Sequence, residues 1–193
     1  MPGPDNTASP RPLEPTTDHD RRKVLAAQNV SRMCLVCGTQ NALGLRARFY
    51  ELGGAELLGV FTPREEHQSY PGRLHGGIAG AILDETIGRA VLLTDRGAWG
   101  VTAEFSVRFR KPIPLGGELR CLARLTRDTS RLFEGTGEIL LPDGSVAAEG
   151  RGKYVKLGIE AIAAGGMAEG EWLADGRERP DEVELAPSPP RRD

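Results

Sequence analysis

An aspartate, Asp84, lies within an apolar run that follows the tripeptide His75-Gly76-Gly77. The run is too long for an ordinary strand, so it predicts a helix that starts near Gly76 and ends near Leu93. Two glycines at the start of a helix each cost about 1 kcal/mol relative to alanine. They do, however, leave backbone N–H groups bare at the positive end of the helix dipole. A carboxylate inside an apolar helix and an open amide are the groups needed to attack a carbonyl and to stabilise its oxyanion.

One face of this helix carries few side chains apart from Asp84. At 100° per residue, three glycines project within about 40° of Asp84: Gly77, Gly80 and Gly88. Larger apolar residues cover the flanks: Ile78, Ile82, Leu83 and Ile87. The face can therefore accept a partner helix at close range or a substrate. The neighbouring Glu85 precedes Arg89 by four residues, the favourable order for a surface ion pair, and is expected to be structural.

The spacing of Gly77 and Asp84 bears on assembly. The two residues are separated by about 10 Å along the helix axis, at a rise of about 1.5 Å per residue. A reacting carbonyl must lie about 3 Å from both the oxyanion donor and the attacking group. One helix cannot meet both conditions, whereas two antiparallel copies can. A site built from this helix is therefore expected to be a two-fold dimer site that occurs twice.

The rest of the central chain is predicted to form strands around the helix. Turn residues and alternation of apolar and polar positions predict six strands, over residues 43–52, 55–62, 101–109, 117–127, 131–141 and 145–157. Turns are expected at residues 53–54 and 142–144. Two strands, a long helix and four strands in an antiparallel meander are typical of an α+β fold with a sheet curled round one helix. Glycines within the predicted strands, such as Gly135 and Gly150, indicate curvature or close packing.

The length of 193 residues and the apolar content of 39% fit one domain with tails. Residues 1–18 are rich in Pro, Thr, Ser and Asp and are expected to be a disordered tail. The domain is expected over residues 19–157, with a short helix over residues 22–30 capped by Asp18 or Asp20. Residues 158–193 are expected to be a largely irregular tail that could dock a partner around Trp172.

Composition also bounds the location and the partners. The sequence contains no apolar segment of 18 residues and no signal-peptide hydrophobic region, which predicts a cytoplasmic protein that does not enter a membrane. A net charge of −2 with interspersed acids and bases gives no nucleic-acid footprint.

The three cysteines raise the hypotheses of a metal site and of a redox-active pair. Cys34 and Cys37 have the C-x-x-C spacing, but a zinc site needs four ligands, and the other candidates are Cys121 and three scattered histidines. A redox pair lacks the βαβ context of thioredoxin-like motifs. The favoured interpretation is a buried, reduced turn before the first strand, with no metal. Cys121 alternates with apolar residues on one strand face and is expected to lie in the core.

Taken together, these segments resemble the PaaI-like hotdog-fold acyl-CoA thioesterases. The resemblance rests on His75-Gly76-Gly77 followed by Asp84, on Gly72 three residues before the histidine, and on residues 101–112 and 116–119. It covers about residues 34–157, and the C-x-x-C-G string resembles a segment that precedes the first strand in some members. Many members carry an Asn in the loop before the glycines, where this chain has His67, Gln68 and Ser69.

The resemblance implies an α+β hotdog fold and an acyl-CoA thioesterase that releases the free acid and CoA. Asp84 would act as base or nucleophile, and the Gly77 N–H of the other protomer would be the oxyanion donor. Burial against the apolar flanks would raise the pKa of Asp84. In the family, a Ser or Thr eighteen residues after the acid can hold the water, and Thr102 occupies that position. Alternation turns Thr102 away from the apolar face of its strand, unless the strand end twists or bulges.

The resemblance also implies the remaining site residues and partners. His75 would orient the loop or cap the helix, and no cofactor is expected. Contacts to the acyl-CoA substrate would come from these residues: Ser69, Gly76, Arg110, Lys111 and Arg131. A homodimer would be required, and assembly of two dimers into a homotetramer is left open. Three alternatives remain: a non-catalytic acyl-CoA-binding module, a dehydratase or hydratase on the same fold, and an oligomerisation scaffold.

Overall fold

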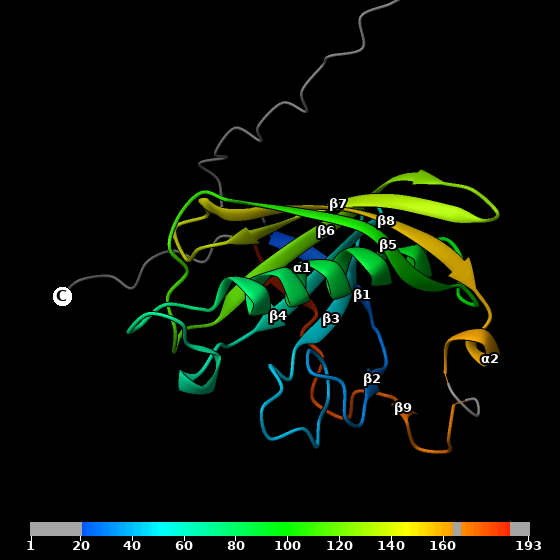
Figure 1. The fold of residues 1–193 in the computed structure, drawn as a ribbon, viewed down its shortest axis with the longest axis horizontal. Coiled ribbons are helices and arrows are strands. Elements are labelled where there is room, and N and C mark those ends of the chain that lie inside the picture. Colours follow the sequence, from blue (N-terminus) through cyan, green and yellow to red (C-terminus); the bar gives the residue numbers. More distant parts are fainter. Residues whose placement is uncertain (1–20, 164–166, 186–193) are drawn as a thin grey trace, which may run out of the picture.

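A long helix, α1 (Gly76–Arg89), lies against an eight-stranded antiparallel sheet that curves over it (Figure 1). The structure is a computed structural model of the chain and describes residues 21–163 and 167–185. The strand order is β10-β1-β3-β4-β6-β7-β8-β5. The strands of this sheet are β1 (Arg21–Ala27), β3 (Arg48–Leu52), β4 (Glu56–Phe61), β5 (Trp99–Phe109), β6 (Leu119–Asp128), β7 (Leu132–Leu140), β8 (Val146–Leu157) and β10 (Glu182–Glu184).

Smaller elements lie around α1 and the eight-stranded sheet. The shorter elements are the paired strands β2 (Val30–Ser31) and β9 (Trp172–Leu173), the 3-10 helices η1 (Glu65–His67) and η2 (Ala90–Leu93), and the one-turn helix α2 (Ile159–Ile162). The α+β hotdog architecture that the sequence predicts is confirmed, as are the start of the helix at Gly76 and the turn after Leu52. Within the described ranges, no helix has the length and apolar character needed to cross a bilayer.

Glycines in the sheet allow α1 to approach it closely. Ile82, Leu83 and Ile87 are fully buried between the helix and the sheet. A Cβ atom at Gly135 would lie 2.7 Å from Ile87 Cγ2, and one at Gly150 would lie 3.3 Å from Leu83 Cβ. Side chains at these positions would push the helix away, so the strand glycines serve close packing, as expected.

The expected meander of four strands is wrong at its first member. β5 does not pair with β6; it lies at the far edge of the sheet and pairs with β8 instead. α1 carries the chain across the sheet from β4 to that edge, and β6 then returns to pair with β4. The alternation of apolar and polar residues in a strand indicates which face is buried, but it does not indicate which strand lies beside it. The position of β5 in the sheet was therefore predicted wrongly. The first predicted strand, residues 43–52, also starts later, at Arg48.

The expected helix over residues 22–30 is wrong as well, because this segment forms β1 and β2. Val24 is buried and pairs with Leu52 of β3, and pairing with the sheet outweighs the weak local preference for helix. The expected caps Asp18 and Asp20, like the tail expected over residues 1–18, lie outside the described residues.

The segment after Leu157 adds strands to the domain. β10 pairs with β1, so that Arg21 lies opposite Glu184, and Val183 and Leu185 are buried. The domain boundary expected at residue 157 therefore cuts off two paired strands. The partner-docking role expected around Trp172 is not supported, because the Trp172 ring packs edge-to-face on Trp99 with centroids 5.0 Å apart.

Candidate active site

Asp84 lies on α1 where β5 and β8 pass over the helix, and two hydroxyl groups hold its carboxylate. Thr102 Oγ1 of β5 donates to both carboxylate oxygens, at 3.0 and 3.2 Å. Tyr154 OH of β8 donates to Asp84 Oδ1 at 3.0 Å and lies 3.1 Å from the Asp84 backbone oxygen. The Oδ1 atom thus receives two short hydrogen bonds, whereas Oδ2 receives only the longer one from Thr102.

A bulge in β5 brings Thr102 to this position. The register with β8 shifts between Thr102, which lies opposite Tyr154, and Glu104, which lies opposite Lys153. Ala103 is the extra residue, and it changes the face on which the following side chains lie. Thr102 and Phe105 therefore both face α1, although strict alternation assigns them to opposite faces. The bulge that the position of Thr102 requires is therefore present in β5.

Burial sets the electrostatics of the site. The half-buried position of Asp84 raises the pKa of its carboxyl, because removal from water disfavours the charged form. The hydrogen bonds from Tyr154 and Thr102 lower this pKa, and the neighbouring Glu85 raises it slightly. The net direction is upward, as the sequence analysis expects for a carboxylate that acts as a base near neutral pH.

The amino-terminal end of α1 is capped by the preceding histidine. The Gly77 N–H donates to His75 Nδ1 at 2.9 Å, so the predicted oxyanion donor is bonded within its own chain. His75 and Gly77 are both exposed, and a Cβ atom at Gly77 would meet only the His75 ring. Of the two roles considered for His75, this geometry is that of a cap.

The glycine face of α1 is partly covered by the chain itself. A Cβ atom at Gly88 would lie 3.2 Å from Tyr154 Cε1, and one at Gly80 would lie 3.9 Å from Phe105 Cε1. These two glycines make room for aromatic side chains of β8 and β5. The expectation that this face of α1 is free of side chains is therefore wrong at Gly80 and Gly88. The approach to Gly77 is the part that remains open.

A small pocket of about 170 Å³ opens beside Asp84. Its aromatic and polar walls come from Thr102, Tyr154, Trp99 and Trp172, and the apolar side chains of η2 complete it. Sequence reasoning missed Tyr154 and Trp172 as site residues. Tyr154 follows Gly150 and Gly152 on the helix-facing side of β8, and this small-to-large alternation was the available signal.

A second, larger pocket of about 570 Å³ gathers most of the predicted substrate-binding residues. The predicted residues that line it are Ser69, Gly76, Arg110 and Lys111, and Tyr70, Arg73 and Phe109 join them. The Arg110 guanidinium is already paired with Glu149 at 2.9 and 3.1 Å. Arg131 does not belong to this group, because it lies immediately before β7, where its backbone oxygen accepts from Lys156 N–H.

His67, in the loop that precedes α1, is a structural residue. It is 2% exposed, and its Nδ1 accepts from Arg64 N–H at 3.0 Å while Nε2 lies 2.9 Å from Leu43 O. Both ring nitrogens are therefore used in holding the loop before α1, so His67 is not available to a substrate.

The Glu85–Arg89 pair forms as predicted, with Arg89 Nε donating to Glu85 Oε1 at 2.7 Å. It is not a surface pair, because Arg89 is 7% exposed and packs between the rings of Phe49 and Trp172. Arg89 also donates to the backbone oxygen of Asn29 at 2.8 Å and to Cys37 Sγ at 3.1 Å.

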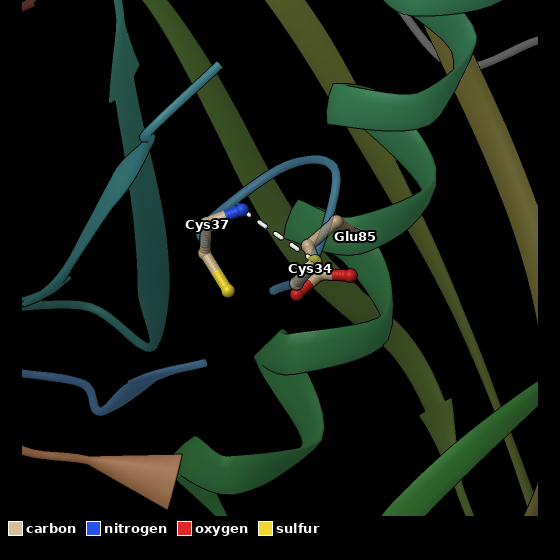
Figure 2. A group of neighbouring side chains, drawn as sticks. All are labelled: Cys34, Cys37 and Glu85. Atoms are coloured by element: carbon tan, nitrogen blue, oxygen red, sulfur yellow. Dashed lines mark hydrogen bonds between the residues drawn. The ribbon is translucent and has the colours of Figure 1, made fainter. Parts of the chain in front are cut away.

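The side chains of Cys34 and Cys37 lie close to Glu85 (Figure 2). Their ligand-type atoms lie within 4.8 Å of one another, the one such group of three among residues 21–163 and 167–185. The cysteines are free thiols, and Cys121 is fully buried in the core, as predicted.

Comparison with known proteins finds similar sequences and similar folds. The sequence pattern of the thioesterase superfamily matches residues 71–148, which include His75, Asp84 and Thr102. Acyl-coenzyme A thioesterase 13 of Homo sapiens is 31% identical over 88 residues, which are 45% of this chain and 63% of the relative. The mouse protein of that name is 28% identical over 97 residues, or 50% of this chain and 69% of the relative. The chain thus spans less than two thirds of the human relative.

Solved structures show the same fold. A crystal structure of a thioesterase superfamily protein has a TM-score of 0.60 and 31% identity, covering 65% of this chain and 64% of that chain. The PaaI protein of Escherichia coli, from the phenylacetic acid degradation operon, has a TM-score of 0.54 and 18% identity, covering 59% and 81%. The chain therefore has the hotdog fold of these structures, and its residues 71–148 are similar to the thioesterase superfamily.

Proposed function

We propose that the protein is an acyl-CoA thioesterase that hydrolyses an acyl- or aryl-CoA to the free acid and CoA. The observation that carries the proposal is the Asp84 carboxylate, held by Thr102 and Tyr154 at the edge of a pocket, with a pKa raised by burial. A carboxylate in a purely structural role is usually paired with a cation, and no cation contacts Asp84 in the described part of the chain.

Two routes fit this carboxylate. As a general base, Asp84 takes a proton from water while the water oxygen attacks the thioester carbon, and it then returns the proton to the departing thiolate of CoA. As a nucleophile, it attacks the thioester carbon, expels the thiolate of CoA and forms an acyl anhydride, which water then hydrolyses to the free acid and the Asp84 carboxylate. In both routes Thr102 and Tyr154 fix the carboxylate, and Oδ2, which has the weaker contact, faces the reacting atoms.

The oxyanion donor comes from a second copy of the chain. Gly77 and Asp84 lie about 10 Å apart along α1 at the rise of a helix, too far to act on one carbonyl within one chain. Two features support a two-fold homodimer. Gly77 is exposed, and β5 forms one edge of the sheet, where its unpaired backbone groups can pair with a second β5. His75 releases the Gly77 N–H when the substrate carbonyl binds.

The two pockets divide the substrate between them. The pocket beside Asp84 holds the acyl group, and at about 170 Å³ it favours a short or aromatic acyl group, because pockets for drug-sized ligands begin near roughly 300 Å³. The larger pocket beside Gly76 holds the CoA moiety, with the phosphates near Lys111 and Arg73. Because Gly76 precedes the proposed donor, the CoA pocket of one protomer adjoins the Asp84 pocket of its partner.

The decisive experiment is hydrolysis of a panel of short, medium and aryl acyl-CoAs, followed by release of free thiol. Wild-type protein should turn over, and Asp84→Ala should lose at least 100-fold in kcat. Asp181→Ala, which removes an exposed carboxylate with no hydrogen-bond partner in the described part of the chain, is the matched control. No thiol from any substrate would refute the enzyme, and full activity of Asp84→Ala would refute the assignment of the acid.

A non-catalytic acyl-CoA-binding module is the second candidate. It is favoured by the His75 cap, which occupies the Gly77 N–H in this structure. Such a module would bind acyl-CoA in calorimetry and release no thiol. Its Asp84→Ala variant would bind acyl-CoA as tightly as the wild-type protein. The same panel therefore separates the two candidates.

A further inference from the structure

Cys34 and Cys37 are held in one tight turn that follows β2. The Gly38 N–H donates to Cys34 O at 2.9 Å, and a Cβ atom at Gly38 would lie 2.3 Å from that oxygen, so only glycine closes the turn. Cys34 Sγ accepts from the N–H groups of Val36 at 3.3 Å and Cys37 at 3.5 Å, the second of which is drawn in Figure 2. The backbone thereby places the two sulphurs within 4.8 Å of each other.

The two thiols differ in environment. Cys34 is half-buried, and the hydrogen bond from the Cys37 thiol, together with the N–H groups of Cys37 and Val36, lowers the pKa of Cys34 to about 6 despite its burial and the nearby Glu85. Cys37 is fully buried, and its hydrogen bond to Cys34 and its burial raise the pKa of its thiol. Cys34 is thus the accessible thiolate at neutral pH, and Cys37 is the thiol behind it.

The group does not suit a metal ion. Glu85 brings a third ligand-type atom, but Arg89 donates to Glu85 Oε1 at 2.7 Å and to Cys37 Sγ at 3.1 Å. A cation bound by these three side chains would lie against a guanidinium that contacts two of its ligands, and the two like charges would repel each other. The same guanidinium favours negative charge on the Cys37 sulphur, which must lose its proton to act as a nucleophile in thiol–disulfide exchange.

We propose that Cys34 and Cys37 form a dithiol–disulfide redox site that reacts with low-molecular-weight disulfides, with Cys34 as the attacking and Cys37 as the resolving cysteine. The Cys34 thiolate attacks one sulphur of the disulfide RSSR, forms a mixed disulfide and expels RS⁻. Cys37 then loses its proton and attacks Cys34 Sγ, which expels the second RS⁻ and leaves an intramolecular disulfide. Two protein thiols are oxidised and one RSSR is reduced to two thiols. The sulphurs approach by less than about 3 Å to reach the S–S distance of about 2.05 Å.

This site does not depend on the proposed hydrolase activity, so its test uses no thioester. The full-length chain is treated at pH 7 with excess of an aryl disulfide whose thiolate product is coloured. Wild-type protein should release two thiolates per chain and lose 2 Da without an adduct, as one disulfide bond forms. Cys37→Ala should release one thiolate and retain one aryl adduct on Cys34. Cys34→Ala should react at least tenfold more slowly than wild type, because the remaining thiols, Cys37 and Cys121, are buried.

Two further measurements guard against misfolded variants. Cys121→Ala should behave as wild type, and all variants are compared by circular dichroism. The rate for the folded wild-type protein should rise with pH to a plateau with a midpoint near 6, because the hydrogen bond from the Cys37 thiol lowers the pKa of Cys34 to that value. The charged groups that act on the pair are Glu85 and Arg89 of α1. A stable aryl adduct on wild-type protein would overturn the proposal, as would a midpoint above pH 8, an unchanged rate in Cys34→Ala, or a stoichiometric metal ion that blocks release.

Discussion

The Thr102 hydroxyl donates to both carboxylate oxygens of Asp84 because a single bulge residue, Ala103, turns it toward α1. We predict that Thr102→Val lowers kcat about tenfold or more, since a hydrogen bond to a charged group is worth roughly 1.5–3 kcal/mol. Thr102→Ser keeps the hydroxyl and should retain most activity. Thr136→Val, in the middle of β7, makes the same replacement of a hydroxyl by a methyl group away from Asp84 and is the control. Equal kcat values for Thr102→Val and Thr102→Ser would show that the contact is not used.

Tyr154→Phe should shift the pH dependence of activity upward. Removal of the Tyr154 hydroxyl takes away a hydrogen bond that lowers the pKa of Asp84, so that pKa rises further. In the proposed mechanism Asp84 must be ionised to act, and the acid limb of kcat against pH should therefore move to higher pH. The ring stays stacked on Phe133 at 4.8 Å, so the fold should persist. Tyr50→Phe, which removes a buried hydroxyl away from the site, should leave the profile unchanged.

Asp84→Asn should stabilise the protein at neutral pH while it abolishes activity. The pKa of Asp84 in the folded state lies above its unfolded value of about 3.9, so stability from this group is full below pH 3.9 and is lost as pH rises through the folded-state pKa. Asparagine removes that loss, and its oxygen can still accept from Thr102 and Tyr154. We expect Tm to rise by roughly 2–4 °C at pH 7, the equivalent of about 1 kcal/mol, and to stay unchanged at pH 3. A lower Tm at pH 7 would mean that the carboxylate stabilises the fold.

His75→Ala should cost stability rather than activity. The His75 ring caps α1 through Gly77 N–H, and loss of such a cap costs about 1 kcal/mol, or roughly 2–4 °C in Tm. The same change frees the proposed oxyanion donor, so kcat/KM should be maintained or increased. His75→Asn, a good N-cap residue, should restore Tm. A loss of kcat above 100-fold with an intact fold would instead assign His75 to the chemistry.

The accuracy of the sequence predictions depended on how local each feature is. The helix, its glycines and Asp84 lie within one stretch of 14 residues, and local periodicity located them correctly. The position of Thr102 depended on a bulge that alternation cannot reveal, and Tyr154 reaches Asp84 across 70 residues of chain. β1 and β10 were missed because their pairing joins opposite ends of the described chain, Arg21 with Glu184. Local propensity carries no information on such contacts.

The proposed sharing of each active site between two protomers can be tested directly, because two defects can complement each other across a dimer. Gly77→Pro removes the proposed donor N–H near the start of the helix, where proline is tolerated, and Asp84→Ala removes the acid. Each variant alone should form an inactive homodimer. A heterodimer of the two should regain about half of wild-type activity, since one of its two sites then has both an intact Gly77 and an intact Asp84.

The matched control places both changes in one chain. A heterodimer of the double variant Gly77→Pro/Asp84→Ala with wild type carries one defect in each shared site and should be inactive. Both heterodimers can be purified with two different affinity tags and assayed for thiol release at equal dimer concentration. If each site were built within a single chain, the activities would be reversed. The heterodimer of the double variant with wild type would then be half active, and the heterodimer of Gly77→Pro with Asp84→Ala would be inactive. The ratio of these two heterodimers therefore decides whether Gly77 and Asp84 act across the two-fold axis, independently of which acyl-CoA is hydrolysed fastest.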